Sequence, residues 1–501
     1  MCGRGEIGRR SRLKIGFLWS AGSSPAVRTI AAAAALAACQ PGAETGSIAV
    51  SAIGSPPRLG IQGARVRDTP SRLLIDATAQ GLVRFDAAGQ IEPGLAERWI
   101  VIDQGRSYIF RLREARWADG RPVDAPTVAR LLARQVRRGG RNPLSPFLTA
   151  IESVVAMTPQ VIEVRLARPR PDLLKLFAQP ELALVRPDPV VGSGPLMIAA
   201  GGTTALLRPV PDIDMEGDNA QRSAPDIRLV GERAARAIAR FAAGRADLVT
   251  GGTFADWPLV AAAGILPTAI GLDPAAGLFG LAITRRDGFL ADAANRAAVA
   301  QAIDRSQVTA AVAVGLEPAE TLLPVSTEAT AAPVATPTWA LPTMDERRSA
   351  ARARVQAWTG GPVILRIALP QGPGATRLWG GLAASLRRVG IEARRVALDE
   401  PAELQLVDAV APYDDPRWYL ASACRPCGAE ADERLEAARI ANTLAERAAR
   451  SAEADAALTA DVAFIPLARP LRWSLVAPGL TAWAPNARAW HPLNHLRLPP
   501  T

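Results

Sequence analysis

Cys424 and Cys427 have the clearest capacity for covalent chemistry in this sequence, because only two residues separate the two thiols. In an exported chain, an even pair of cysteines favours a disulfide. A thioredoxin-like redox site would place the pair at the head of a helix after an early βαβ unit, whereas this pair follows Trp418 to Ser422, deep in the C-terminal half. We therefore predict a structural disulfide, with free thiols and a redox or metal site as the alternatives.

Other residue types that carry chemistry are scarce. The two histidines, His491 and His495, have Pro492 between them, which prevents the usual spacing on one helical turn, so we predict solvated histidines and no metal site. Asp414 and Asp415 precede a proline, a pattern typical of a turn. The chain has no G-x-S-x-G motif. These observations predict a protein that is not an enzyme and that needs no cofactor.

Length and charge narrow the class further. A chain of 501 residues is long enough for several domains. Its formal net charge is +10, but six basic residues before Cys39 against the single acid Glu6 account for +5. No basic block with interleaved aromatic residues follows, so the composition argues against a nucleic-acid partner. No apolar run reaches the length of about 18 residues that a membrane-spanning helix needs.

The N-terminal segment is built like a bacterial secretory signal. Arg28 precedes a short apolar run of mostly alanine that ends at Cys39. Leu36 to Cys39 resembles a lipobox, in which the cysteine becomes the lipid-modified first residue of the mature protein. The alternative is an alanine-rich helix that happens to end in cysteine. We expect 1–39 to be a presequence with lipidation at Cys39, and a periplasmic protein held to a membrane by its lipid anchor.

The best-specified folding unit is a strand, a turn and a helix. Tyr108, Phe110 and Leu112 alternate with more polar residues, which predicts a strand with one apolar face. The dipeptide Asp119-Gly120 supplies a turn, and Asp124 stands where a helix N-cap belongs. By these patterns alone, the unit is scaffold and names no chemistry.

The order of residues in this unit resembles a segment of the extracellular solute-binding proteins that serve peptide, nickel and related ABC importers. The resemblance rests on Phe110, Leu112, Arg113, Trp117, Asp119, Gly120, Pro122, Ala125 and Val128. Two spacings are one residue shorter than in the family. The segments 93–99 and 296–305 also resemble the family, so the resemblance extends from about residue 70 to the C-terminus.

The resemblance implies an α/β, periplasmic-binding-protein-like fold with two α/β lobes around a ligand cleft and an additional small subdomain. The implied boundaries are 40–70 for a tether and the start of lobe I, 71–181 for subdomain II, 182–256 for lobe I, 257–469 for lobe III and 470–501 for the return to lobe I. It also implies a monomer that captures a small solute and delivers it to the permease subunits of an ABC importer.

The resemblance also points to a ligand site. Peptide-binding relatives carry W-x-x-D-Y-x-[DE]-P, in which the first Asp pairs with the ammonium group of the peptide. Tyr413, Asp415 and Pro416 match this pattern, whereas Ala409 and Pro412 replace the Trp and the ammonium-binding Asp. We expect Asp408, Tyr413 and Trp418 to contact the ligand, and free-amino peptides to bind poorly. A non-transport envelope lipoprotein on the same fold and a CxxC thiol oxidoreductase are the alternatives.

Overall fold

The computed structural model describes residues 47–59, 68–137, 139–187, 190–210, 225–324 and 333–496. The expected presequence 1–39, with Cys39, lies outside these residues, as do 40–46 and 60–67 of the expected tether 40–70. Within the described ranges, no helix combines the length and the apolar character that crossing a membrane requires.

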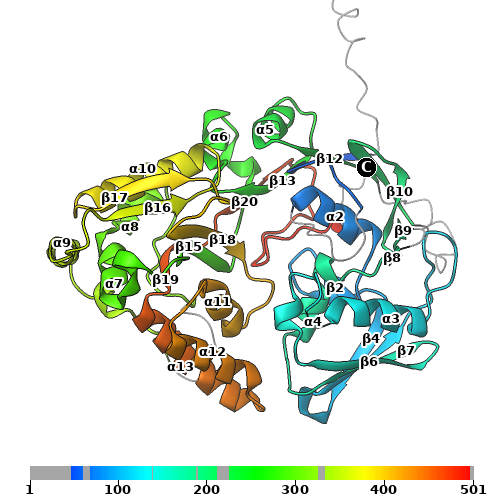
Figure 1. Cartoon of the computed structure of the whole chain (residues 1–501). Helices are drawn as coiled ribbons and strands as arrows, with labels where there is room; N and C mark the ends of the chain where they lie inside the picture. Colours follow the sequence, from blue (N-terminus) through cyan, green and yellow to red (C-terminus); the bar gives the residue numbers. More distant parts are fainter. Residues whose placement is uncertain are drawn as a thin grey trace, which may run out of the picture. The chain divides into compact units, whose positions relative to one another are not determined.

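A seven-stranded sheet brings together strands from both ends of the chain (Figure 1). Its order is β10 (Leu196–Ala200), β11 (Thr204–Pro209), β12 (Asp226–Glu232), β1 (Ser47–Ile53), β13 (Leu248–Thr253), β20 (Arg472–Val476) and β14 (Ile270–Asp273). β1 runs parallel to both β12 and β13, which α5 (Ala234–Ala242) connects. β12, α5 and β13 therefore form a β-α-β crossover, with the N-terminal strand β1 inserted between its two strands.

β20 runs antiparallel to β13 on one side and to β14 on the other. This pairing keeps β14 in the seven-stranded sheet, although the expected boundary of lobe I at residue 256 assigned β14 to lobe III. The physical reason is that all four residues of β14 pair with β20 in an antiparallel ladder, so backbone hydrogen bonds hold β14 in this sheet. α6 (Trp257–Ala262) lies in the chain between β13 and β14.

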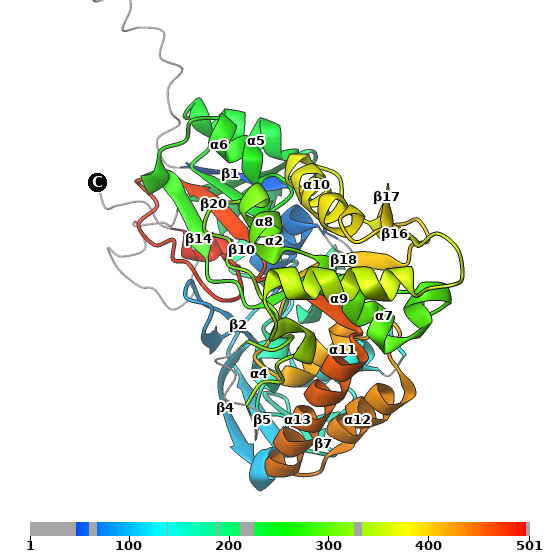
Figure 2. The same cartoon turned by 90° about the vertical axis from the view of Figure 1, so that its left-hand side faces the viewer.

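A second, five-stranded sheet has the order β17 (Glu392–Val396), β16 (Ile364–Ala368), β18 (Leu404–Val410), β15 (Gly277–Ile283) and β19 (Phe464–Ala468). All seven residues of β15 are buried, as expected for a strand covered on both faces. α10 (Pro373–Arg387) packs against β17, and α8 (Arg305–Val312) packs against α10 and β19. α7 (Ala293–Ala302) and α9 (Met344–Gln356) pack against each other beside this sheet (Figure 2).

The predicted strand-turn-helix unit belongs to a third part of the structure. Its four-stranded sheet has the order β4 (Ala96–Ile102), β5 (Ser107–Leu112), β7 (Val161–Leu166) and β6 (Ile151–Thr158), and α3 (Ala125–Val136) packs on β6 and β7. The apolar face of β5 is buried, and Trp117 is only 2% exposed. Gly120 has φ +85° in the turn, and Asp124 Oδ1 accepts a hydrogen bond of 2.7 Å from the Thr127 backbone N–H. The predicted turn and N-cap are confirmed.

Shorter elements complete this third part and connect it to the first sheet. They are α2 (Thr69–Thr78), β2 (Val83–Phe85), β3 (Ile91–Pro93), α4 (Leu173–Phe177), β8 (Arg186–Pro187) and β9 (Val190–Val191). α2 packs against β1, β10 and β12 of the seven-stranded sheet. Its buried face therefore lies on the first sheet.

Three helices follow β18 and lead to β19. They are α11 (Pro416–Ala423), α12 (Ala429–Ile440) and α13 (Leu444–Asp461), and Figures 1 and 2 both show α12 and α13 side by side. Residues 441–443 separate α12 from α13. Helices and sheets together confirm the predicted α/β class.

Candidate functional site

A cavity of about 490 Å³ is lined by residues from all three parts of the structure. α2 and the third part supply Thr69, Arg72, Leu73, Pro143, Leu144, Phe147, Gln179 and Glu181, whereas β13 supplies Thr250, Gly251 and Thr253. The end of β18 and the segments after it supply Asp408 to Pro412, Trp418, Arg472 and Arg488 to His491. A cavity of this size, lined by apolar side chains and a few convergent polar groups, has the properties of a site for a small solute.

The structure brings two of the three predicted ligand residues to this cavity. Asp408 and Trp418 line it, together with Ala409 and Pro412 at the positions that depart from the peptide-binding pattern. Tyr413 is 2% exposed and is not one of the lining residues. Its ring packs edge-on against Phe147, at 5.8 Å between centroids, so Tyr413 lies behind a lining residue.

Asp408 is already ion-paired. Arg472 Nη1 lies 2.8 Å from Asp408 Oδ1, and Arg472 Nη2 donates a bond of 3.3 Å to the backbone oxygen of Asp408. Both side chains are 14% exposed. Burial raises the pKa of Asp408, against the attraction of Arg472. Since Asp408 is on β18 and Arg472 is on β20, this ion pair joins the five-stranded sheet to the seven-stranded sheet.

A second ion pair that lines the cavity joins α2 to the segment after α4. Arg72 Nε lies 2.8 Å from Glu181 Oε1, and the Arg72 guanidinium stacks over the Trp490 ring at 4.6 Å. Trp490 Nε1 in turn donates a bond of 3.3 Å to Asp76 Oδ2. Burial raises the pKa of Asp76 to about 6, despite the nearby arginines. This wall therefore combines an aromatic surface with a paired guanidinium.

The two adjacent aspartates that suggested a turn have separate roles. Asp414 is half exposed and forms ion pairs with Lys175 and Arg488. Asp415 caps α11 by accepting from the Arg417 backbone N–H at 2.8 Å, and it pairs with the buried Arg447. Asp415 is thus a structural residue, whereas Asp414 lies beside the cavity and shares its single charge between two cations.

The prediction of solvated histidines is wrong. His491 is 5% exposed, its Nε2 lies 3.2 Å from Asp273 Oδ2, and its ring packs on Trp483. His495 Nε2 lies 2.8 Å from Glu92 Oε1. The physical reason is that the segment after β20 folds back onto the protein, where each histidine finds a carboxylate partner.

Sequence reasoning missed Arg72, Arg472, Arg488 and Trp490, which are the three arginines and one of the two tryptophans among the described lining residues. None of them belongs to a local motif. The available signal was the expected return of 470–501 to lobe I, which brings arginine and tryptophan residues from the C-terminal segment to the cavity wall.

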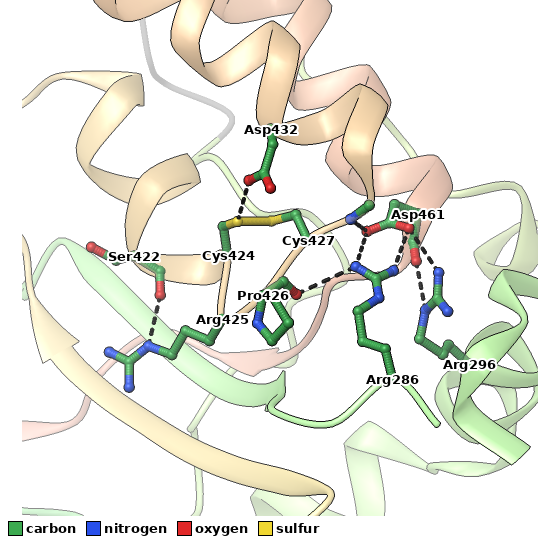
Figure 3. The surroundings of a disulfide bond; sticks show 10 residues. Arg286, Arg296, Ser422, Cys424, Arg425, Pro426, Cys427, Asp432 and Asp461 are labelled. Carbon is green, nitrogen blue, oxygen red and sulfur yellow. Dashed lines mark hydrogen bonds and ion pairs between the residues drawn. A yellow bond between two sulfur atoms is a disulfide. The ribbon is translucent and has the colours of Figure 1, made fainter. Parts of the chain in front are cut away.

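The two cysteines form a disulfide away from the cavity (Figure 3). The Sγ atoms of Cys424 and Cys427 are 1.99 Å apart, and Asp432 Oδ1 lies 3.3 Å from Cys424 Sγ. The loop is anchored by Asp461, which accepts from the Gly428 backbone N–H at 3.0 Å and pairs with Arg286 and Arg296. Burial opposes the ionisation of Asp461, but these hydrogen bonds and charges outweigh it and lower its pKa. The surroundings are those of a braced structural loop.

Solved structures with the same fold bind several kinds of solute. Haemophilus influenzae OppA in complex with RPPGFSPFR matches with a TM-score of 0.77 and 16% identity, over 91% of this chain and 99% of that chain. The Escherichia coli murein tripeptide binding protein MppA matches with a TM-score of 0.77 and 19% identity, over 91% and 99%. NikA from Brucella suis in complex with Fe(III)-EDTA matches with a TM-score of 0.73 and 18% identity, over 91% of this chain and 100% of that chain. These similarities confirm the predicted periplasmic-binding-protein-like fold.

Among curated proteins, the Escherichia coli "Probable deoxycholate-binding periplasmic protein YgiS" is 29% identical over 133 residues. The match covers 23% of this chain and 25% of that protein, so it spans about a quarter of the relative's length. The family model for "Bacterial extracellular solute-binding proteins, family 5 Middle" matches residues 90–418. The chain therefore belongs to the family 5 bacterial extracellular solute-binding proteins.

Proposed function

We propose that this protein captures a small solute in the cell envelope and delivers it to the permease of an ABC importer, without bond chemistry. The observation that carries this proposal is the cavity of about 490 Å³, to which all three parts of the fold contribute. A solute bound there contacts every part at once, so its binding energy favours the closed arrangement. The closed form would then dock on the permease.

The solute we propose has no free amine, whether it is a modified peptide or another small molecule. Pro412 occupies the position at which the peptide-binding proteins that this chain resembles have the Asp that pairs with the ammonium group of the peptide. A proline side chain carries no charge, and its backbone has no N–H donor. The two acids that line the described cavity, Asp408 and Glu181, are both held by arginines. Deoxycholate, the solute in the name of the E. coli relative, carries a carboxylate and no amine, so it belongs in the test panel.

Two measurements test the proposal. Native mass spectrometry of protein purified from its own host should detect a small molecule that leaves on denaturation. Calorimetry should then give micromolar or tighter binding for an N-acetylated peptide or deoxycholate, and much weaker binding for free-amino di- to pentapeptides. Micromolar binding of the free-amino peptides would contradict the amine-free solute. A protein with no carried-over molecule and no response to the panel would contradict solute capture itself.

A substitution tests whether a carboxylate at position 412 restores the binding of free-amino peptides. Pro412→Asp restores a carboxylate at the cavity wall, and we expect it to raise the affinity for free-amino peptides by about 10-fold, the effect of one charge-assisted hydrogen bond. The matched control is Pro401→Asp, because Pro401 is exposed and does not line the cavity. An equal gain in both variants would show a non-specific charge effect.

Attachment to the envelope is a separate part of the proposal. We propose that Cys39 carries the lipid anchor, so Cys39→Ser should move the protein from the membrane fraction to the soluble periplasmic fraction. Attachment through acyl chains depends on about 0.8 kcal/mol per buried CH₂ group and should not survive their loss. A variant that stays in the membrane fraction would show that something else holds it there.

A further inference from the structure

The charges that line the cavity are not balanced. Of the described lining residues, Asp408 and Glu181 are acidic, and each already faces an arginine, at 2.8 Å in both pairs. Arg488 is the third lining arginine, and its Nη1 donates a bond of 2.6 Å to the Ala411 carbonyl oxygen. The cavity therefore has more cationic groups than anionic ones on its wall.

The acid beside Arg488 does not remove this excess. Asp414 pairs with Arg488, but it also pairs with Lys175. One carboxylate is thus shared by two cations. Since Asp414 is 48% exposed while the Arg488 side chain is 6% exposed, solvent weakens the contribution of Asp414 more than that of the buried guanidinium.

The hydrogen bonds of Arg472 show which of its N–H donors are already used. Arg472 bonds to the Asp408 carboxylate, to the Asp408 backbone oxygen and, at 3.0 Å, to the Leu471 carbonyl oxygen. A guanidinium group carries more N–H donors than these contacts use, so donors remain for a ligand acceptor. By contrast, the carboxylate of Asp408 is committed to a cation of the protein itself.

Much of the remaining wall is apolar or aromatic, and it includes Leu73, Leu144, Phe147, Trp418 and Trp490. Such a wall binds a ligand body by burial of apolar area and leaves the orientation to a few polar contacts. The uncharged polar lining residues are Thr69, Gln179, Thr250, Thr253 and His491. The charged contacts on offer are the N–H donors of the arginines.

We propose that the cavity selects a solute with an anionic head group and an apolar body, and that the Arg472–Asp408 pair is its specificity determinant. Arg472 keeps Asp408 from pairing with a ligand amine and offers its remaining donors to a ligand carboxylate. This inference rests on the proposed function, because it names the class of solute that the same cavity takes.

The physical basis is the cost of an unpaired buried charge. An ammonium group that pairs with Asp408 must either displace Arg472, which leaves a mostly buried guanidinium without its carboxylate, or share the carboxylate with Arg472, which brings two cations together in a mostly buried site. A carboxylate meets neither cost, because charge-assisted bonds to the arginines add to the existing pair. The discrimination therefore depends on this pair and not on the apolar wall.

The experiment uses one dipeptide in four forms that differ in which of its two termini carries a charge. The dipeptide Phe-Leu is prepared as the N-acetyl acid, the N-acetyl amide, the free zwitterion and the free-amino amide, and each form is titrated into the full chain by calorimetry. The wild-type protein should bind the N-acetyl acid at least about 10-fold more tightly than the free-amino amide, as expected from a charge-assisted contact. The affinity of the uncharged N-acetyl amide should lie between those of these two forms.

Three variants assign the discrimination to the pair. Arg472→Met frees Asp408, so the free-amino amide should gain about 10-fold in affinity and the N-acetyl acid should lose about 10-fold. Asp408→Asn keeps an acceptor for Arg472 and should strengthen the N-acetyl acid. The double variant should lose the gain for the free-amino amide. Arg366→Met is the matched control, because Arg366 pairs with Glu403 beside the same sheet and does not line the cavity.

Several outcomes would overturn the proposal. They are equal affinities for the four forms, tighter binding of the free-amino amide by the wild-type protein, an unchanged preference in Arg472→Met and Asp408→Asn, or no binding of any form. If Arg472→Met does not fold, Asp408→Asn decides alone. A carried-over neutral or cationic solute in the mass spectrum would also contradict this inference, yet it would support solute capture, so the two proposals fail separately.

Discussion

Gln179 Nε2 donates a hydrogen bond of 2.7 Å to the carbonyl oxygen of Pro412. Gln179 follows α4 in the part that contains the four-stranded sheet, whereas Pro412 follows β18 of the five-stranded sheet. Arg417 makes a similar connection, with a bond of 3.0 Å from its Nη2 to the Pro146 carbonyl oxygen. Both bonds join these two parts beside the cavity, so they hold together two walls of the site to which we assign the solute.

We expect Gln179→Ala to weaken solute binding by about 3- to 10-fold, because one interlobe hydrogen bond contributes about 0.5–1.5 kcal/mol. The loss should appear mainly as faster dissociation in stopped-flow measurements, since under the proposed closure the bond holds the two walls around a bound solute. Gln160→Ala is the control, because Gln160 is exposed in the turn between β6 and β7. Equal effects of the two substitutions would contradict a role in closure.

Trp117 tests the scaffold assignment of the strand-turn-helix unit. The Trp117 side chain is buried in the main apolar core, and its backbone N–H donates to the Arg121 carbonyl oxygen at 2.9 Å. Trp117→Ala should lower the free energy of unfolding by about 3–5 kcal/mol, measured by urea denaturation. Leu266 is 70% exposed, so Leu266→Ala should change it by less than about 0.5 kcal/mol. An unchanged midpoint for Trp117→Ala would contradict the scaffold assignment.

Asp76 predicts a pH dependence of stability. Its pKa is raised by burial from 3.8 to about 6, so the folded protein holds a proton that the unfolded chain has already lost in this range. The free energy of unfolding should therefore fall as the pH rises from about 4 to about 6, by an amount on the order of 1–3 kcal/mol. Denaturation with urea at several pH values measures this slope.

Asp76→Asn should remove this part of the pH dependence and raise the stability at neutral pH, because asparagine is neutral and still accepts the bond from Trp490. Asp345→Asn is the control, since that side chain is 96% exposed. If the slope of Asp76→Asn equals that of the wild-type protein, another group causes it.

The Cys424–Cys427 disulfide predicts a small structural contribution and no effect on binding. A loop closed over a sequence separation of 3 loses little chain entropy, so the double substitution to serine should cost about 2 kcal/mol or less. Solute affinity should stay unchanged, because neither cysteine lines the cavity. Reduction of insulin by the wild-type protein, or lost affinity in the variant, would instead favour the oxidoreductase alternative.

The fold was predictable where local patterns were strong. The alternation over 108–112, the Asp124 N-cap and the crossover over 226–249 each follow from residues close together in the sequence, and the structure has all three. The pairing of β14 with β20 was not predictable in this way, because about 200 residues separate the two strands and neither carries a signal for the other.

The candidate site was predictable only in part. Asp408 and Trp418 lie on the cavity wall, as expected from the neighbouring family motif, but Tyr413 packs behind Phe147. The arginine partners of the wall could not be predicted, because an ion pair such as that of Arg472 with Asp408 depends on the approach of two different sheets. The partners of His491 and His495 are equally remote in sequence, which explains the wrong expectation for both.

The position of β20 between β13 and β14 has a consequence for how the chain folds. The strand that fills this gap is Arg472–Val476, close to the C-terminus, while β1 at the other end of the described chain fills the gap between β12 and β13. A chain emerging from the ribosome cannot complete the seven-stranded sheet until nearly all of it is available. Contacts between such distant segments slow folding. The seven-stranded sheet is therefore expected to be among the last parts of the protein to form.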